Sequence, residues 1–256
     1  MYEVTALRYG TRMTQKSECY YRWSSYGEPD AEIGMDYFFW VLRNGATTIV
    51  VDTGFHPESG ARRGRTTLCP PGEALRLIGV QPETVPMVIL THLHYDHTGN
   101  LEWFPDAELV VQRSELEFWS GPEARHEQLA PLIEPGEIER IAAGRLRLLD
   151  GDAEIVPGIQ AICVGGHSPG QTVLVVETAG GPAVIASDAV HYYEELELER
   201  PFEILVDLPA MYAAYATVRE LAGRPGAALL VGHDPEVMKR FPPLDGEAAG
   251  LGVRVG

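Results

Sequence analysis

The sequence has few cysteines and few basic residues, and both shortages narrow the classes of protein it can represent. Its three cysteines, Cys19, Cys69 and Cys163, show no C-x-x-C spacing, so neither a disulfide framework nor a cysteine zinc knuckle is expected. Lys and Arg number 20 against 37 Asp and Glu, which gives a formal net charge of −17. That excess of negative charge argues against a nucleic-acid partner and against binding to an anionic membrane.

Long apolar runs are also missing. No apolar stretch approaches the roughly 18 residues that a membrane helix needs, and residues 1–15 lack the apolar centre of a signal peptide. With 256 residues, of which 45% are hydrophobic, the chain can form a sizeable core. We expect a cytoplasmic enzyme.

Strands and helices are predicted to alternate along the chain. Val- and Ile-rich runs that end in polar or glycine turns are typical of buried strands, and they lie at 47–54, 85–92, 107–112, 159–167, 172–178, 182–188 and 227–234. Helices are expected at 71–80, 113–120, 122–143 (interrupted by Pro131 and Pro135) and 208–223. This alternation indicates a layered α/β protein. The two halves, roughly 1–120 and 145–256, have a similar texture.

Metal-ligating residue types follow four of the predicted strands directly. They are His92, His167, Asp188 and His233. Ligands at the ends of several strands converge on one edge of a sheet, where rigid elements can position a site carried by loops. The sequence therefore predicts a metal centre at such an edge.

The densest group of donors is the segment THLHYDHTGN at 91–100. In an extended segment alternate side chains point the same way, so His92, His94 and Asp96 are expected on one side, and a turn at Gly99 would bring His97 round. Zinc sites usually hold four ligands, and catalytic ones keep one position for water. The expected arrangement gives His92, His94 and His167 to one ion and Asp96, His97 and His233 to a second, with Asp188 bridging both.

Other polar residues near these segments allow two interpretations. Asp52 could orient a ligand imidazole, since a metal-bound histidine normally donates its other N–H, or it could be a turn residue beside Gly54. Thr91 and Ser168 could likewise donate hydrogen bonds to ligand residues or be simple turn residues. His56 and His126 have no neighbouring donors in the sequence, so we interpret both as ordinary polar residues.

At these motifs the chain resembles the metallo-beta-lactamase superfamily. The similar segments are VDTG at 51–54, THLHYDHTGN at 91–100, GGHSPGQT at 165–172, ASDA at 186–189 and VGHD at 231–234. The resemblance implies one hydrolase domain over 1–256 with a four-layer αβ/βα sandwich of two similar halves. It also implies two divalent metal ions per chain, Zn²⁺ first, with Mn, Fe or Co as alternatives.

Within the superfamily the chain looks most like the N-acyl-homoserine lactone lactonases, which are quorum-quenching enzymes. Zinc β-lactamases place a Cys ligand in the second site, and this sequence has no Cys at a matching position. The best-studied lactonases carry a Tyr three residues after the bridging Asp that contacts the substrate carbonyl. Here that position is His191, followed by Tyr192 and Tyr193. His191 could make the same contact, or the substrate could differ.

The resemblance predicts a hydroxide, shared by two metal ions, that attacks a lactone carbonyl. Asp96 would carry the proton, and His191 or Tyr192 would donate to the oxyanion, so Asp96 and His191 are the predicted catalytic residues. The predicted substrate-binding residues are His191, Tyr192 and Phe55. The aromatic segment 17–40 is expected to supply further pocket walls, although Phe38 to Trp40 also fit a core strand.

Three functions remain open on the sequence alone. A lactonase acting on a small acyl substrate is the first, and a thioesterase or cyclic amide hydrolase of the same superfamily is the alternative. An iron-dependent oxygen or persulfide enzyme is the third, because His and carboxylate ligands also suit iron. A homodimer is the ordinary expectation for an enzyme of this size.

Overall fold

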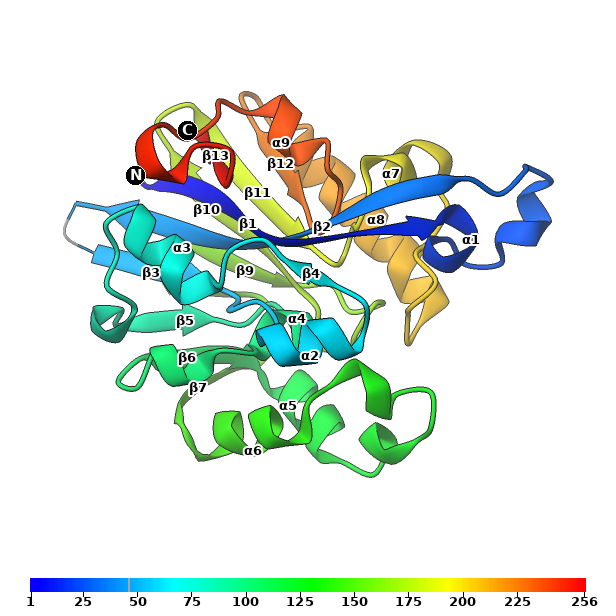
Figure 1. Cartoon of the computed structure of the whole chain (residues 1–256), viewed down its shortest axis with the longest axis horizontal. Coiled ribbons are helices and arrows are strands. Elements are labelled where there is room, and N and C mark those ends of the chain that lie inside the picture. Colours follow the sequence, from blue (N-terminus) through cyan, green and yellow to red (C-terminus); the bar gives the residue numbers. More distant parts are fainter. Residues whose placement is uncertain (46) are drawn as a thin grey trace.

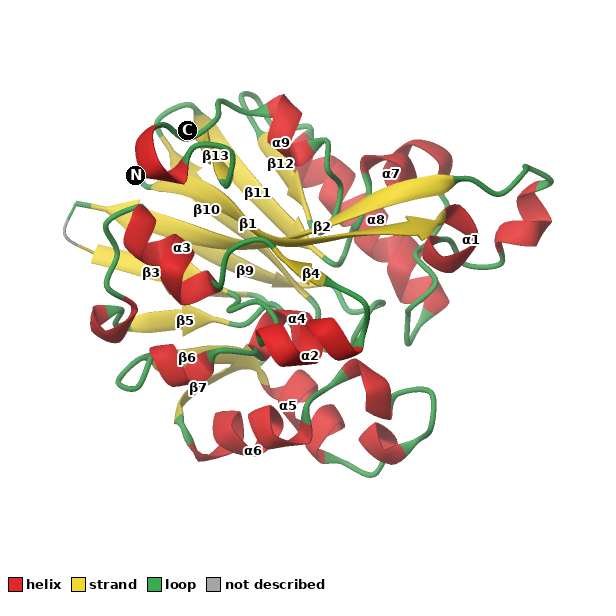
Figure 2. Cartoon of the chain, viewed as in Figure 1, coloured by secondary structure: helices red, strands yellow, loops and turns green. Residues whose placement is uncertain are grey.

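A computed structural model describes residues 1–45 and 47–256, and their strands form two sheets (Figures 1 and 2). The first sheet has the order β13 (Gly252–Val255), β1 (Glu3–Gln15), β2 (Glu32–Asn44), β3 (Thr47–Val51), β5 (Met87–Ile89), β6 (Glu108–Gln112) and β7 (Arg145–Leu149), and β4 (Thr66–Thr67) pairs with β1. The second has the order β12 (Ala228–Val231), β11 (Gly181–Ser187), β10 (Thr172–Thr178), β9 (Ile159–Cys163) and β8 (Ala153–Val156).

Most of the helices lie on the outer sides of the two sheets (Figure 2). Those beside the first sheet are α2 (Pro57–Arg62), α3 (Pro71–Leu77), α4 (Tyr95–Thr98), α5 (Arg113–Ser120) and α6 (Pro135–Ala143). The others are α1 (Lys16–Cys19), α7 (Tyr193–Leu198), α8 (Leu208–Ala222) and α9 (Val237–Arg240). The longest, α8, packs on β11 of the second sheet. The predicted αβ/βα sandwich is confirmed.

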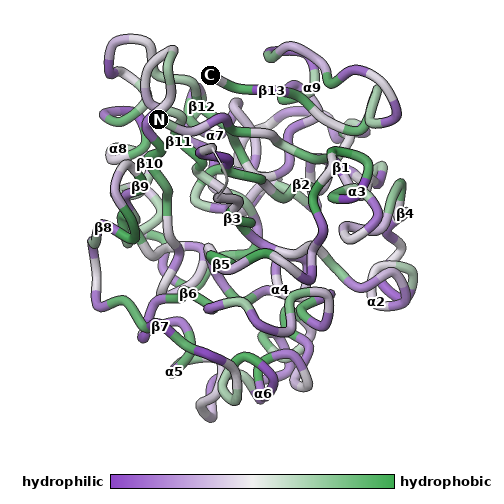
Figure 3. Tube along the Cα trace, turned by 90° about the vertical axis from the view of Figure 1, so that its left-hand side faces the viewer, coloured by the Kyte–Doolittle hydropathy of each residue, from purple (hydrophilic) through white to green (hydrophobic). Residues whose placement is uncertain are grey.

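Strand β2 is apolar at successive positions because both of its faces are buried. Alternate side chains of a strand point to opposite faces. Phe38, Trp40 and Leu42 join the core that the two sheets share with α8. Phe39 and Val41 join the core between the first sheet and its helices. Figure 3 shows the same organisation, with hydrophobic colour along the strands and hydrophilic colour common in the outer loops.

Parallel pairing brings several strand ends to one edge of the molecule. β3, β5, β6 and β7 are parallel neighbours in the first sheet, and β11 and β12 are parallel neighbours in the second. Carboxyl ends of parallel strands share an edge, which is where α/β proteins usually form their sites. The segments that follow β5, β11 and β12 therefore meet there.

Two expectations from the sequence differ from the structure. The strands β7 and β13 belong to the first sheet, so the second sheet is confined to 153–231 and does not coincide with the predicted half 145–256. The predicted helix 122–143 is regular only in α6, after short 3₁₀ turns at Glu123–Arg125 and Ala130–Leu132. Pro131 interrupts it, since proline cannot continue a helix, and Pro135 starts α6.

No helix in the described residues is long and apolar enough to cross a membrane.

Replacing Gly166 by alanine is expected to destabilise the fold. Gly166 has φ +87°, and an added Cβ would lie 2.7 Å from the backbone nitrogen of Met211 in α8. Backbone strain and overpacking of this kind cost about 2–4 kcal/mol together, which denaturant unfolding would measure. Gly136→Ala in α6 is the control, because nothing lies within 4 Å of its added Cβ and alanine favours a helix. Equal stability of the two variants would contradict the expectation.

Candidate metal centre

All seven predicted ligands are buried at the edge where the strands of both sheets end. The segment after β5 carries His92, His94, Asp96 and His97; the loop from β9 to β10 carries His167; and the residues after β11 and β12 are Asp188 and His233. The sequence predicted an extended segment over 91–99, but the structure is extended in only part of it. His94 is the N-cap of the short helix α4, and Asp96 and His97 lie within that helix.

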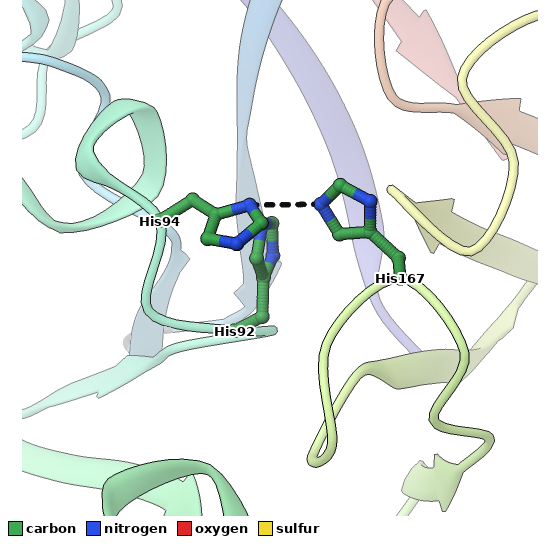
Figure 4. A group of neighbouring side chains, drawn as sticks. All are labelled: His92, His94 and His167. Atoms are coloured by element: carbon green, nitrogen blue, oxygen red, sulfur yellow. Dashed lines mark hydrogen bonds between the residues drawn. The ribbon is translucent and has the colours of Figure 1, made fainter. Parts of the chain in front are cut away.

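One group of donors combines His92, His94 and His167. A ring nitrogen of each lies within 4.8 Å of the other two. Nδ1 of His94 lies 2.8 Å from Nε2 of His167, and Figure 4 shows these two rings facing each other above His92. Three imidazoles that converge in this way can share one metal ion.

A second group combines Asp96, His97 and His233, whose donor atoms also lie within 4.8 Å of one another. Oδ1 of Asp96 is 3.9 Å from Nε2 of His97, and Oδ2 is 3.9 Å from Nε2 of His233. One carboxylate and two imidazoles are a second set of nitrogen and oxygen ligands. They suit zinc and also Mn, Fe or Co.

Asp188 lies between the two groups. Its Oδ2 is 3.1 Å from Nε2 of His233 and 3.5 Å from Nε2 of His167, while Oδ1 is 3.4 Å from Nε2 of His97. Burial alone would raise the pKa of Asp188, but the imidazoles of His233, His97 and His191 hold it well below its usual range. Its carboxylate is therefore placed to contact ions in both groups.

Unpaired ring nitrogens test whether these residues fit metal ions. Among the described residues, Nε2 of His92, His94 and His97 is buried without a hydrogen-bond partner. Buried polar atoms are nearly always paired, and exceptions need a cause such as an ion. The donor set is consistent with a dinuclear metal site, and its oxygen and imidazole donors suit divalent ions.

The opposite ring nitrogens of three histidines donate hydrogen bonds to fixed acceptors. Nδ1 of His97 donates to Asp52 Oδ2, Nδ1 of His167 to the Ile204 carbonyl, and Nδ1 of His233 to the Asp36 carbonyl, each at 2.8 Å. Such bonds fix the ring orientation and leave Nε2 for a metal.

Asp52 has both of the roles that the sequence left open, because it is a turn residue and it also orients an imidazole. It has a positive φ of 59°, as a turn residue beside Gly54. Its carboxylate also accepts hydrogen bonds from His97, from the backbone nitrogen of Thr91 and from the Thr91 hydroxyl, all at 2.8 Å. The same hydroxyl lies 3.2 Å from Nδ1 of His92. One carboxylate thus links both ends of the donor-rich segment.

Glu115 of α5 was missed by the sequence analysis. Its buried carboxylate accepts hydrogen bonds from the backbone of Leu93 and Gly170, from the Ser168 hydroxyl and from the Trp119 indole. It joins the segment of His92 and His94 to the loop of His167. A lone glutamate in a helix gives no sequence signal that separates this role from an ordinary surface position.

The protonation of His97 differs from that of the histidines in the first group. Burial lowers the pKa of His94 to about 4 and lowers those of His92 and His167 well below the usual value. Burial would also lower the pKa of His97, but the carboxylates of Asp188, Asp52 and Asp96 outweigh it and raise this pKa well above the usual value. At neutral pH the first group is ready to ligate, whereas His97 must lose a proton.

His191 lies against the centre. Its Nε2 is 3.2 Å from Oδ2 of Asp188 and its Nδ1 is 3.4 Å from Oε1 of Glu195, but neither nitrogen makes a well-directed hydrogen bond. The ring stacks on Phe202, with centroids 3.7 Å apart and planes 11° apart. Burial would lower the pKa of His191, but the carboxylates of Asp188 and Glu195 raise it to about 9.

The structure places Tyr192 and Phe55 differently from His191. The Tyr192 hydroxyl donates to the Gly34 carbonyl at 3.2 Å. Phe55 is fully buried against Tyr9 and Tyr37. Neither side chain lines the cavity at the metal centre, because each packs in the core between the first sheet and its helices.

A small cavity of about 40 Å³ opens beside the seven donors. Its walls are Arg12, Met35, Tyr37, Arg65, His94, Tyr95, Asp96, Leu132, His167, Asp188, His191, Phe202, Ile204 and His233. Tyr37 is the one aromatic of the 17–40 segment among them. A cavity of about 380 Å³ near Gln160 and Pro182 is larger but includes no predicted site residue, so the smaller one is the chemically relevant space.

An αβ/βα sandwich that gathers histidines and aspartates at one edge of its sheets defines a class of metalloproteins. The chain matches the sequence profile of the metallo-beta-lactamase superfamily over residues 36–233. It therefore belongs to that superfamily.

Several proteins that this chain resembles are N-acyl homoserine lactonases. One from Bacillus cereus is 31% identical over 166 residues, which cover 64% of this chain and 62% of the relative. The match thus spans less than two thirds of that relative's length. The N-acyl homoserine lactonase AiiB of Agrobacterium fabrum is 27% identical over 209 residues, 74% of this chain and 76% of the relative.

Solved structures show the same fold across nearly the whole chain. A quorum-quenching N-acyl homoserine lactone lactonase superposes with a TM-score of 0.77 at 24% identity, covering 94% of this chain and 95% of that one. The dizinc quorum-quenching lactonase AidC gives a TM-score of 0.73 at 18% identity, covering 91% and 88%. At these identities the likeness concerns the fold.

Replacing Asp52 by asparagine is expected to weaken zinc binding about 10- to 100-fold, as loss of an orienting partner usually does. It should also reduce the protons released on zinc binding near pH 7, because His97 loses a carboxylate that raises its pKa. Wild-type affinity should rise with pH up to the pKa of His97. Calorimetry in two buffers of different ionisation enthalpy measures both quantities.

Asp207→Asn is the matched control. Asp207 caps α8 through a hydrogen bond to the backbone nitrogen of Ala210, and asparagine caps a helix equally well. Zinc affinity and proton release should match the wild type. Unchanged values in Asp52→Asn as well would contradict the orienting role.

Proposed function

We propose that this chain is a metal-dependent hydrolase that opens a lactone ring. The observation that carries the proposal is the buried set of five imidazoles and two carboxylates beside a cavity, with three ring nitrogens unpaired. The names of the similar proteins support the lactone as the substrate class.

Two ion positions follow from the two donor groups. His92, His94 and His167 would hold one ion, and Asp96, His97 and His233 the other, with the Asp188 carboxylate between them. Divalent ions bound there would supply hydroxide near neutral pH and would polarise the acyl carbonyl.

Asp96 is the proposed proton carrier. Its carboxylate lines the cavity, and the Tyr9 hydroxyl donates to its backbone carbonyl at 2.7 Å, which holds α4 in place. A carboxylate at the cavity wall can accept a proton from the attacking water and return it to the alkoxide that leaves when the ring opens.

His191 is the proposed donor to the carbonyl oxygen. It lines the cavity beside Asp188, and the stack on Phe202 limits rotation of its ring. An oriented N–H contributes most where negative charge develops in a site that excludes water. The apolar walls Met35, Leu132 and Ile204 provide that exclusion. Because the space is only about 40 Å³, an acyl substrate must displace side chains on entry.

A substrate panel tests the proposal. The zinc- or manganese-loaded protein would be assayed with lactones, thioesters and cyclic amides of matched acyl groups. We expect kcat/KM for the lactones to exceed the others by about a hundredfold or more, a ratio that a shaped site can reach. Fast thioester cleavage without lactone turnover would make the protein a thioesterase, and one iron and no zinc per chain after native purification would indicate the iron-dependent class.

Replacing His191 by phenylalanine is expected to lower kcat for a lactone about 100- to 1,000-fold, the usual loss for one oxyanion donor. Phenylalanine keeps the stack on Phe202, so bound metal should stay unchanged. Tyr192→Phe is the control, since its hydroxyl bonds to Gly34 outside the cavity. If loss of bound metal in His191→Phe accounts for the whole decrease in kcat, the donor role of His191 is excluded. An equal decrease in kcat in His191→Phe and Tyr192→Phe would also exclude it.

A further inference from the structure

Two arginines line the wall of the metal cavity. Arg12 lies near the end of β1, and Arg65 lies directly before β4. The chain carries 37 acidic residues against 20 Lys and Arg, so two guanidinium groups at one small cavity run against its overall charge. The mechanism above uses neither of them.

Both arginines are held by the same pair of residues on β2. Arg12 faces Met35 across the β1–β2 ladder, and its Nε lies 3.4 Å from the Met35 sulfur. The Tyr37 hydroxyl donates to that sulfur at 3.3 Å and accepts from Nε of Arg65 at 3.1 Å. The Tyr37 ring in turn meets His233 edge-on, with centroids 5.0 Å apart. The two guanidinium groups are therefore joined to one another and to the metal centre through two side chains.

Neither arginine has a close carboxylate of its own. The nearest ion pair of Arg12 is with Glu18 at 4.0 Å, and that glutamate side chain is 61% exposed. Within the described chain Arg65 forms no ion pair inside 4.0 Å. Its neighbour Arg63 contrasts with it, because Arg63 lies 2.6 Å from Glu134. An exposed ion pair at 4.0 Å is weak, so both guanidinium groups keep capacity for an anion.

The carboxylates of the centre cannot balance this charge once metal ions are present. Asp96 and Asp188 are the acidic side chains of the cavity wall, and two divalent ions would already exceed their combined charge. The guanidinium groups then add to a positive wall. A site with this balance favours a substrate that brings negative charge with it.

We propose that the substrate carries a carboxylate, separate from the bond that is cleaved, which Arg12 and Arg65 bind. Arginine matches carboxylates because its planar fork donates two parallel hydrogen bonds. The inference rests on the proposed lactone hydrolysis and narrows its substrate class to acidic lactones. A neutral acyl chain would bring no carboxylate to either guanidinium group.

A pair of lactones that differ only in charge tests the inference. 5-Oxotetrahydrofuran-2-carboxylate carries the acid, and its carboxamide is the neutral counterpart. Ring opening adds one water across the acyl C–O bond, so the acid yields 2-hydroxyglutarate and one proton. With the zinc-loaded protein we expect kcat/KM for the acid to exceed that for the amide about tenfold or more, since a hydrogen bond to a charged group has that effect.

Arg12→Gln and Arg65→Gln should each remove most of that preference. Turnover of the acid should fall about tenfold or more, while turnover of the amide stays within about threefold. Arg254→Gln is the matched control, because Arg254 is an exposed arginine on β13 outside the cavity. If a variant fails to fold, the charge preference of the wild type decides alone. Equal turnover of acid and amide by the wild type would overturn the inference and leave lactone hydrolysis standing.

Calorimetry separates the two proposals. The zinc-loaded protein is titrated with 2-hydroxyglutarate and with 4-hydroxybutyrate, which lacks the second carboxylate. The carboxylate site is supported if 2-hydroxyglutarate binds more tightly than 4-hydroxybutyrate and this difference is lost in Arg12→Gln and Arg65→Gln. If no lactone is turned over in addition, the lactonase proposal is rejected while the carboxylate site stands. Equal binding of both ligands, or no binding of either, would reject the carboxylate site.

Discussion

The burial of Asp188 among imidazoles from both donor groups is the constraint on which the rest of the site depends. Its two oxygens lie 3.1 to 3.5 Å from ring nitrogens of His233, His97 and His167. Removing so many polar groups from water is costly unless each finds a partner. The protein supplies a hydrogen-bond acceptor for Nδ1 of His97, His167 and His233. The Nε2 atoms of the same rings point toward the donor groups. Desolvation of these groups would thus be the source of an affinity for divalent cations.

Two buried carboxylates keep that arrangement rigid from outside the cavity. Asp52 fixes Thr91 and His97 on one side, and Glu115 joins the backbones of Leu93 and Gly170 on the other. Each connects segments that are distant in sequence. Because sites held by a second layer of hydrogen bonds keep their geometry, the chain can hold its seven donors mostly on loops without the imprecision that loops usually bring.

The sequence revealed the strands that precede the donors and the donors themselves, because period and residue type carry that signal. It did not reveal the partners of His167 and His233, which are the backbone carbonyls of Ile204 and Asp36. Every residue has such a carbonyl, so residue type cannot point to one. Likewise β7 and β13 lie within the predicted half 145–256 and yet pair with the first sheet, because pairing partners depend on long-range packing. Phe55 has the composition of a pocket wall and lies in the core.

The donors come from segments of both sheets, and this has a consequence for how the protein can vary. Residues between the sheets, such as Trp40, Leu174 and Ile185, set the distance from one sheet to the other. They therefore also set, within each group, the distance between the donors that follow β5 and the histidine from the second sheet, although none of them touches the cavity. A change of one methyl group in that interior layer would alter how closely the donors of each group approach one another. Catalytic properties can thus be adjusted from a distance, with every reacting residue left as it is.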